Sequence, residues 1–358
     1  MDFLSYLKTS AKDINQELDQ FLESWQKEVG EISPRLNPLV QVFIEACEGG
    51  KRLRGALVKL GYEISANRLQ TTDYRGRRKM EDERHEILKP AAAFEIFQTA
   101  ILAHDDIIDQ SDLRRGRKTL WKALGGNHYG ISQTICLGDI GFFLAYKLLA
   151  ESNFPDKLKN KAIQFFTKSM ISTGLGQMMD VALPNSSGWS SEEDVLTIFR
   201  LKTAHYTLVG PLQLGAILGG GNDNLLSYIE KFGESLGIAF QIQDDILGVF
   251  GDEKTLGKSV ASDAEEGKIT LLLIEALRRA NARQKQILDK YYDQGKIGEE
   301  ELNQIRKIFI ETGAMAYSQE KAQQLVAQAK DVIRQMDISQ DHKSLLEEMA
   351  DFLVKRDK

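Results

Sequence analysis

Long segments in which apolar residues recur every three or four positions most strongly limit what this chain can fold into. One such segment contains Phe94, Phe97 and Ile101, and another spans residues 304–311 (QIRKIFIE). This spacing matches the turn of an α-helix, whereas the alternation typical of half-buried β-strands is nearly absent. Only six of the 358 residues are proline, so few positions interrupt a helix. The sequence therefore predicts an all-α chain.

Several helix boundaries are also marked in the sequence. Pro90 precedes AAAFEIFQTAILAHDDIID and occupies a position where helices commonly begin. Ser190 and Glu193 are spaced as a capping box ahead of VLTIFRLKTAHYTLVG. The run 219–222 (GGGN) predicts a helix end followed by a turn. No shift in composition separates a second domain, so we expect a single domain over residues 1–358.

The composition argues against several classes of protein. A net charge of −6 disfavours nonspecific nucleic-acid binding, which needs a cationic surface. The charge of the basic run at 75–79 is cancelled by the acidic residues after it, and we expect 67–86 to be a polar surface loop or a short solvated helical piece. Cys47 and Cys136 lack metal-ligand spacing, which predicts two packed thiols in a reducing compartment. No signal-peptide core or membrane-spanning apolar run is evident, so we expect a cytoplasmic protein without stable membrane insertion.

A cluster of aspartates follows directly on one long apolar helical segment. Asp105 and Asp109 are four residues apart and share a helix face, with Asp106 beside them and Asp112 a further turn along. Like charges at this spacing destabilise a helix, so a divalent cation is the natural partner. Mg²⁺ in particular prefers one or two carboxylates together with phosphate oxygens. A solvated acidic face fits poorly, because the apolar residues 101–103 lead straight into the cluster.

A second pair of aspartates, Asp244 and Asp245, lies in a similar apolar setting, FQIQDDILG. Two such helices facing each other would line a pocket able to hold several Mg²⁺ ions, and the ions could grip a diphosphate. An iron or manganese site in a helical bundle usually includes a Glu-x-x-His pair. That pair is not found near either cluster.

Basic residues near these segments supply groups that bind phosphate. Guanidinium groups bind phosphate through two hydrogen bonds, and lysine offers a compact point charge. The candidates are Lys51, Arg52, Arg54, Arg114, Arg115, Lys202, Lys258 and Lys268.

The chain resembles trans-type (head-to-tail) polyprenyl diphosphate synthases in six motifs. In order along the chain these are GGKRLRG, HDDIIDQSDLRRGRKT, GQMMD, LKTAHYT, FQIQDDILG and GKSVASDAEEGKIT. Among these, the chain looks most like geranylgeranyl diphosphate synthases. The resemblance implies a bundle of long antiparallel helices around a central active-site cavity, usually as a homodimer. It also implies that isopentenyl diphosphate is condensed with an allylic diphosphate to a longer all-trans product, with Mg²⁺ as cofactor.

The resemblance also assigns roles to matching positions. The metal-binding residues would be Asp105, Asp106, Asp109, Asp244 and Asp245. The groups that hold isopentenyl diphosphate would be Lys51, Arg54 and Arg115, with Gln98 assisting. The allylic diphosphate would be held by Arg114, Lys202, Lys258 and Lys268. Lys202, Thr203 and Gln241 would act in catalysis, the last two beside the reacting carbons, and Arg356 would close over the site.

The resemblance further bears on the product. Gly248 stands where the family commonly has a third aspartate, so we expect the second metal site to survive with one ligand fewer. Bulky aromatics at the fourth and fifth positions before the first cluster stop growth at the farnesyl stage in the family. Here these positions are Ile101 and Ala100, which would leave room, while Phe97 and Phe94 could form a floor. This predicts a geranylgeranyl product.

Three alternatives stay open. A longer-chain polyprenyl diphosphate synthase would carry the same motifs. A class I terpene cyclase also pairs an aspartate-rich helix with Mg²⁺, but it lacks a second diphosphate site and usually has an Asn/Ser/Glu motif in place of DDILG. A regulatory subunit of a heteromeric synthase is suggested only by Gly248.

Overall fold

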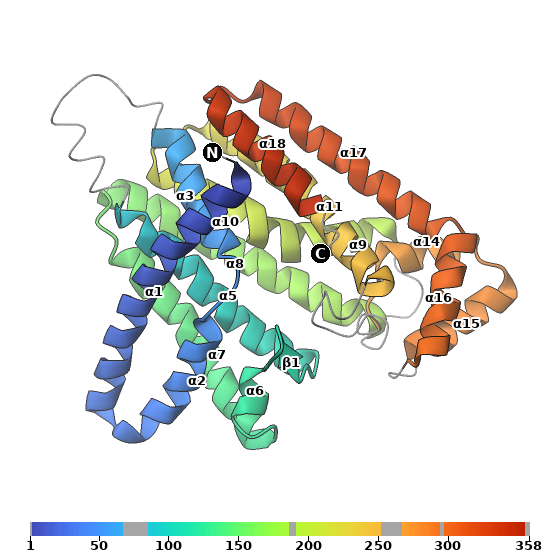
Figure 1. Ribbon diagram of the computed structural model, residues 1–358, viewed down its shortest axis with the longest axis horizontal. Coiled ribbons are helices and arrows are strands. Elements are labelled where there is room, and N and C mark those ends of the chain that lie inside the picture. The colour runs from blue at the N-terminus through green and yellow to red at the C-terminus, as the bar shows by residue number, and fades with distance from the viewer. Residues whose placement is uncertain (1, 67–84, 186–190, 252–266, 294–296, 355–358) are drawn as a thin grey trace. The chain divides into compact units, whose positions relative to one another are not determined.

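The computed structural model describes residues 2–66, 85–185, 191–251, 267–293 and 297–354 (Figure 1). The α-helices are α1 (Phe3–Ile32), α2 (Asn37–Cys47), α3 (Leu53–Ala66), α5 (Leu88–Ile108), α6 (Leu120–Ala123), α7 (His128–Ala150), α8 (Asp156–Ala182), α9 (Glu192–Ile198), α10 (Gly210–Leu218), α11 (Asp223–Phe250), α14 (Leu271–Arg279), α15 (Ala282–Asp293), α16 (Glu299–Glu311), α17 (Ala314–Gln335) and α18 (Gln340–Val354). The remaining elements are the 3₁₀ helices η1 (Pro34–Leu36) and η3 (Leu183–Asn185), the π-helix η4 (Phe199–Val209), and the strands β1 (Leu113–Arg114) and β2 (Arg117–Lys118). The all-α prediction is confirmed. Residues 67–84 of the predicted segment 67–86, Lys258 and Arg356 lie outside the described residues, whereas residues 85 and 86 of that segment are helical.

The structure agrees with one predicted helix boundary and corrects another. Helix α10 ends at Leu218, and Gly220 has a φ of 77°, as expected for a glycine turn. The capping box before α9, however, is formed by Ser191 and Asp194, one residue later than predicted. Both registers place a hydroxyl and a carboxylate three residues apart, so the spacing alone could not choose between them.

The described residues fall into two compact units, and each is described by itself. Unit 1 comprises Met1–Thr167, Gly210–Leu226 and Ile338–Leu345; unit 2 comprises Lys168–Val209, Ser227–Asp337 and Leu346–Lys358.

Helix α5 forms the centre of unit 1. It contacts α1, α2, α3 and α7, and almost every residue of its first half is buried. Helices α3 and α10 approach closely because Gly61 and Gly215 have no side chain: a methyl group on either would overlap a backbone carbonyl oxygen of the other helix. These contacts fix α5, whose end carries the first aspartate cluster.

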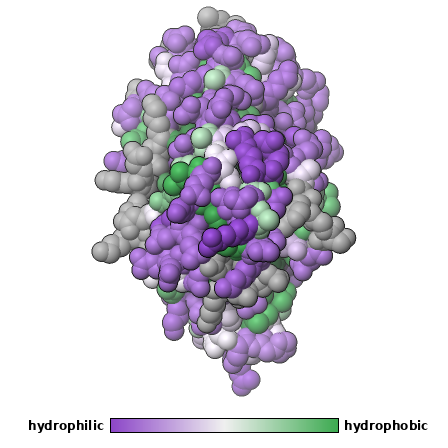
Figure 2. Space-filling model, turned by 90° about the vertical axis from the view of Figure 1, so that its right-hand side faces the viewer, coloured by the Kyte–Doolittle hydropathy of each residue, from purple (hydrophilic) through white to green (hydrophobic). Residues whose placement is uncertain are grey.

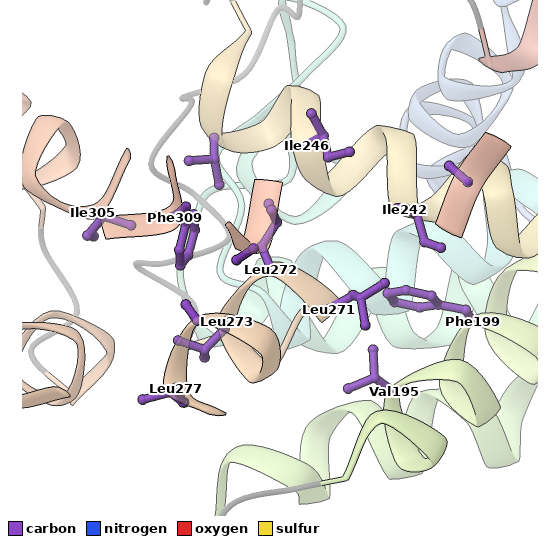
Figure 3. Packing of buried hydrophobic residues seen from close by; sticks show 14 of the residues in the cluster. Val195, Phe199, Ile242, Ile246, Leu271, Leu272, Leu273, Leu277, Ile305 and Phe309 are labelled. Atoms are coloured by element: carbon purple, nitrogen blue, oxygen red, sulfur yellow. The ribbon is translucent and has the colours of Figure 1, made fainter. Parts of the chain in front are cut away.

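The core of unit 2 joins α9, η4, α11, α14 and α16 (Figure 3). Ile242 and Ile246 of α11 are buried, four residues apart on one face of the helix. Ile305 and Phe309 of α16 are fully buried as well, which confirms the helical spacing seen in QIRKIFIE. The buried stripe on α11 fixes the rotation of this helix, and with it the direction of the aspartates between those isoleucines.

The surface is mixed. On the face in Figure 2 hydrophilic side chains predominate and hydrophobic ones form small patches. Helices α7 and α8 expose larger apolar side chains. On α7, Ile135, Ile140 and Phe143 are 44%, 41% and 74% exposed, and on α8, Ile171, Leu175 and Met178 are 60%, 51% and 68% exposed. In the described part of the chain, α7 is also the one helix long and apolar enough to cross a membrane, and 44% of its apolar window is buried inside the protein.

The cysteines only partly match the prediction of two packed thiols. Both are free. Cys47 is buried, and burial raises the pKa of its thiol to about 12. Cys136 is exposed on α7, because it lies on the same outward side of the helix as the exposed apolar residues.

Candidate functional site

The GGKRLRG segment forms a tight connection between α2 and α3. Gly49 and Gly50 have φ values of 73° and 82°, which glycine adopts without steric cost. Arg52 also has a positive φ, 51°, which is unfavourable for a residue with a Cβ. Its side chain offsets this by donating to Asn15 Oδ1 at 2.6 Å and to the carbonyl oxygen of Cys47 at 2.7 Å. The arginine in the middle of the motif is therefore structural.

Glu95 of α5 also holds the GGKRLRG segment in place. Its carboxylate accepts a hydrogen bond from the Gly55 amide at 2.8 Å and lies 3.7 Å from Arg52 Nη1. Both charged side chains are buried, at 5% and 7% exposed. The flanking Lys51 is exposed and Arg54 is half-buried. Glu95 was not identified from the sequence, although a lone carboxylate inside the apolar run AAAFEIF could have signalled a buried ion pair.

The antiparallel hairpin β1–β2 brings two more arginines to this segment. Arg115 and Gly116 form its turn, with φ values of 53° and 75°. Arg115 passes directly over Gly50: a methyl group there would lie 2.7 Å from Arg115 Nη1. Arg117 Nη1 also lies 3.3 Å from Glu48 Oε2. The left-handed backbone at position 50 favours glycine, and a side chain there would also have to displace the Arg115 guanidinium.

Together these elements create a guanidinium cluster, which we define as Arg52, Arg54, Arg114 and Arg115. Burial lowers the pKa of Arg115, and the charges of Arg114, Arg54 and Arg52 lower it further, while Glu95 acts in the opposite sense. Several cations held close together around one buried carboxylate form a site for a polyvalent anion such as a diphosphate.

The first aspartate cluster lies at the carboxyl end of α5. Asp109 follows the last helical residue but keeps a helical φ of −80°, so it remains one turn from Asp105. Asp112 was expected one turn further along the helix. It lies instead beyond the helix end and pairs with Lys122 at 2.9 Å, because the chain turns into the hairpin after α5. The oxygen donors of the cluster are therefore Asp105, Asp106 and Asp109.

Arg114 connects the guanidinium cluster to these aspartates. Its Nη2 lies 2.6 Å from Asp106 Oδ1 and 3.6 Å from Asp105 Oδ2. Burial raises the pKa of Asp106, against the lowering effect of Arg114, and the charge of Asp105 adds to the rise. Burial acts against the charged form of Arg114, but its bond to Asp106 and the nearby carboxylates outweigh this and raise its pKa. In this structure Arg114 thus contacts the metal-ligand candidates themselves.

In unit 2, the predicted catalytic residues are joined by hydrogen bonds. Thr203 Oγ1 donates to Gln241 Oε1 at 2.7 Å, and Gln241 Nε2 donates to Asp245 Oδ1 at 2.8 Å. Thr203 lies on the π-helix η4, a rare element that is frequent at functional sites. Gly237 of α11 lets the two helices touch, since a methyl group there would lie 2.5 Å from Ala204 Cα.

Lys202, the other predicted catalytic residue, pairs with Asp180 of α8. The distance from Lys202 Nζ to Asp180 Oδ2 is 2.6 Å. Gly176, one turn earlier on α8, permits the close approach, because a methyl group there would lie 2.6 Å from the Lys202 amide nitrogen. Sequence reasoning noted the GQMMD motif but gave Asp180 no role, and only the contact reveals it.

The other predicted residues are distributed over both units. Gln98 is half-buried on α5 in unit 1. Asp244 is half-buried on α11 in unit 2, with the buried Gly248 one turn further along. Lys268 is half-buried just before α14, also in unit 2.

The positions expected to control product length differ from one another in burial. Phe97 packs against Phe142 of α7, with 5.0 Å between ring centroids. Ala100 has no exposed surface and also lies against α7, where a methyl group on Gly141 would come within 2.8 Å of its Cβ. Ile101 is only half-buried. Of the two positions expected to leave room, only Ile101 therefore has accessible surface.

Known proteins of one family are similar to this chain. A model of the polyprenyl synthetase family matches residues 36–309. A geranylgeranyl diphosphate synthase from Sulfolobus acidocaldarius is 32% identical over 313 residues, 87% of this chain and 88% of that one. A geranylfarnesyl diphosphate synthase from Aeropyrum pernix is 32% identical, over 74% of this chain and 81% of that one.

Among solved structures, a geranylgeranyl pyrophosphate synthase from Corynebacterium glutamicum, complexed with isoprenyl diphosphate and magnesium, superimposes with a TM-score of 0.89. It is 27% identical, and the match covers 99% of this chain and 100% of that one.

Proposed function

The chain belongs to the polyprenyl synthetase family, and on that basis we propose that it condenses isopentenyl diphosphate with an allylic diphosphate to give geranylgeranyl diphosphate. The prenyltransferase class follows from the family. The observation that carries the proposal is the position of the guanidinium cluster directly beside the aspartates of α5, linked through Arg114. The family model extends over residues of both units, which supports treating residues 1–358 as one catalytic domain.

Isopentenyl diphosphate would be held by Lys51, Arg54 and Arg115, with Gln98 near them on α5. The Arg115 guanidinium lies over Gly50, and Arg54 lies on the first turn of α3, which Glu95 anchors. Because the backbone holds these cations in place before the substrate arrives, little conformational entropy is lost on binding. Burial lowers the pKa of Arg115, and repulsion by the neighbouring guanidinium groups lowers it further; a bound diphosphate would relieve that repulsion.

The oxygen donors on α5 and α11 fit a divalent metal. Asp105, Asp106 and Asp109 would hold it in unit 1, and Asp244 and Asp245 in unit 2. Carboxylate oxygens are the donors that Mg²⁺ prefers, and Arg114 beside Asp106 indicates that this carboxylate is used as an anion despite its burial. Bound Mg²⁺ would neutralise the charge of the allylic diphosphate as it leaves.

The allylic diphosphate would be held by Arg114, Lys202, Lys258 and Lys268. The ion pair with Asp180 orients Lys202, and a diphosphate would compete for the same ammonium group. Loss of diphosphate leaves an allylic cation, and the double bond of isopentenyl diphosphate attacks it. The oxygens of Thr203 and Gln241 stabilise the positive charge, because their hydrogen-bonded chain to Asp245 orients both dipoles. A proton is then lost, with the departing diphosphate as its acceptor.

Product length would be set on the helix face below Asp105. Ile101 has accessible surface, whereas Phe97 is enclosed by the aromatic ring of Phe142. An aliphatic side chain at position 101 with an aromatic floor one turn deeper supports a chain longer than farnesyl. The relatives named as geranylgeranyl and geranylfarnesyl diphosphate synthases are consistent with this range.

We also infer a cytoplasmic homodimer. The exposed apolar residues of α7 would be costly to hydrate, and a second copy of the chain would remove them from water. The same face accounts for the apolar length of α7 without a membrane, since the rest of that helix is packed on α5.

The test is incubation of the purified chain with Mg²⁺, isopentenyl diphosphate and each allylic primer in turn, with products resolved by chain length. The proposal expects consumption of isopentenyl diphosphate and a geranylgeranyl product. Longer products would favour a longer-chain synthase. Use of an allylic diphosphate without isopentenyl diphosphate would favour a terpene cyclase. Absence of turnover, restored only by a partner protein, would favour a regulatory subunit.

A further inference from the structure

A group of metal-ligating side chains in unit 2 is separate from the aspartate clusters. It consists of His205 on η4 and of Glu230 and Glu234 on α11. One ligand atom from each lies within 4.8 Å of the other two, and His205 Nε2 is 2.8 Å from Glu234 Oε1. Glu230 is exposed, while His205 and Glu234 are 20% and 31% exposed, so an ion could reach the group from solvent.

We propose that His205, Glu230 and Glu234 form a binding site for a divalent transition-metal ion, of which Zn²⁺ fits the donors best. One imidazole nitrogen and two carboxylate oxygens are typical zinc ligands, whereas Mg²⁺ prefers oxygen ligands alone. Around a tetrahedral zinc ion, ligand atoms at about 2.0–2.2 Å from the metal lie about 3.3–3.6 Å apart. The 2.8 Å between His205 Nε2 and Glu234 Oε1 would lengthen on metal binding, and rotation of the exposed Glu230 side chain supplies the remaining movement. A water molecule would complete the four ligands.

The backbone around this group is held before any ion binds. Glu230 and Glu234 are four residues apart and share one face of α11, where their like charges repel each other. Ser169 of α8 donates a hydrogen bond to the His205 carbonyl oxygen at 3.4 Å. Gly237, one turn beyond Glu234, allows Ala204 to contact α11 directly. The histidine is thus presented to two glutamates on a rigid frame, which lowers the entropic cost of binding an ion.

The charges near the group have opposing effects. The hydrogen bond from His205, together with its charge and that of Arg200, lowers the pKa of Glu234, against the effect of burial. Arg200 itself opposes a second cation, but its guanidinium also lies 4.0 Å from Glu193 and is partly neutralised there. Without a metal, the same residues form an ordinary His–Glu ion pair, which is the competing outcome.

An ion here would act on the predicted catalytic residues through the backbone. The site joins η4 to α11, and the Thr203–Gln241 hydrogen bond joins the same two helices. Thr203 lies two residues before His205 on η4, and Gln241 lies about two turns after Glu234 on α11. Metal binding would therefore fix η4, including Lys202 and Thr203, against α11.

The experiment uses the full chain stripped with a chelator and titrated with Zn²⁺ in the presence of excess Mg²⁺, which occupies the aspartate clusters. Calorimetry should give one Zn²⁺ per chain, and zinc should raise the melting temperature. His205→Ala and Glu234→Gln should each weaken binding at least about tenfold and abolish the thermal shift. His128→Ala, an exposed histidine on α7, is the matched control and should bind Zn²⁺ as the unmodified chain does.

Two further measurements separate this site from other zinc binding. Co²⁺ in place of Zn²⁺ should give the strong visible absorption of a four-coordinate site with a nitrogen ligand, and His205→Ala should lose it. Glu230→Gln, at an exposed position where folding is not at risk, should weaken Zn²⁺ binding as well. If zinc does not bind, or binds equally to the His205 and Glu230 variants, the group is an ion pair only and the proposal is overturned.

Discussion

Replacing Gln241 with leucine tests the hydrogen-bonded chain from Thr203 through Gln241 to Asp245. Leucine is close to glutamine in size and suits a helix, but it can make neither the 2.7 Å bond to Thr203 nor the 2.8 Å bond to Asp245. A hydrogen bond to a charged group contributes about 1.5–3 kcal/mol, and one between neutral groups about 0.5–1.5 kcal/mol. Asp245 is only 6% exposed, so water cannot readily replace the lost donor. We therefore expect the free energy of unfolding to fall by about 2–4 kcal/mol.

The same substitution should also slow turnover. Removal of one preorganised dipole from a developing charge commonly lowers kcat by about 100-fold or more, and here both the Gln241 oxygen and the orientation of Thr203 are lost. Urea unfolding followed by circular dichroism measures the stability, and steady-state assays at saturating Mg²⁺ and substrates measure kcat. Gln243→Leu is the matched control, because position 243 lies about 200° around α11 from position 241. A Gln241→Leu variant with unchanged stability and kcat would refute the reasoning.

Three further predictions concern unit 1. Asp105→Ala should abolish turnover because it removes a metal ligand from the first cluster, and a near-normal rate in the prenyltransferase assay would exclude that role. Ile101→Phe should shorten the product in chain-length analysis because position 101 has accessible surface, and an unchanged length distribution would contradict this. Ala100→Phe, at a fully enclosed position, should instead lower the free energy of unfolding in urea by about 1–3 kcal/mol. Gly50→Ala should raise KM for isopentenyl diphosphate far more than it lowers kcat. Position 50 has a φ of 82°, and a methyl group there would lie 2.7 Å from Arg115 Nη1 and displace this guanidinium. Equal kinetic constants for variant and parent would show that Arg115 does not hold that substrate.

Some parts of the site could be found from the sequence because they depend on residues close together along the chain. Asp105 and Asp109 share a helix face by their spacing alone. The prediction failed at Asp112, because α5 ends before that residue and the spacing cannot show where a helix stops. Glu95 and Asp180 were not identified because a carboxylate gains its role from its partner, and their partners lie 43 and 22 residues away.

The sequence by itself determined that the chain is helical. It also determined which side chains are available to bind metal or phosphate, and their order along the chain. Helical periodicity and side-chain chemistry are local properties. Only the tertiary structure decided which of these side chains contact each other: Arg114 with Asp106, Lys202 with Asp180, and Thr203 with Gln241. These pairs depend on how closely separate elements approach. Glycines at the contacts allow that approach, and the steric reason for such a glycine appears only when the opposing backbone is in place.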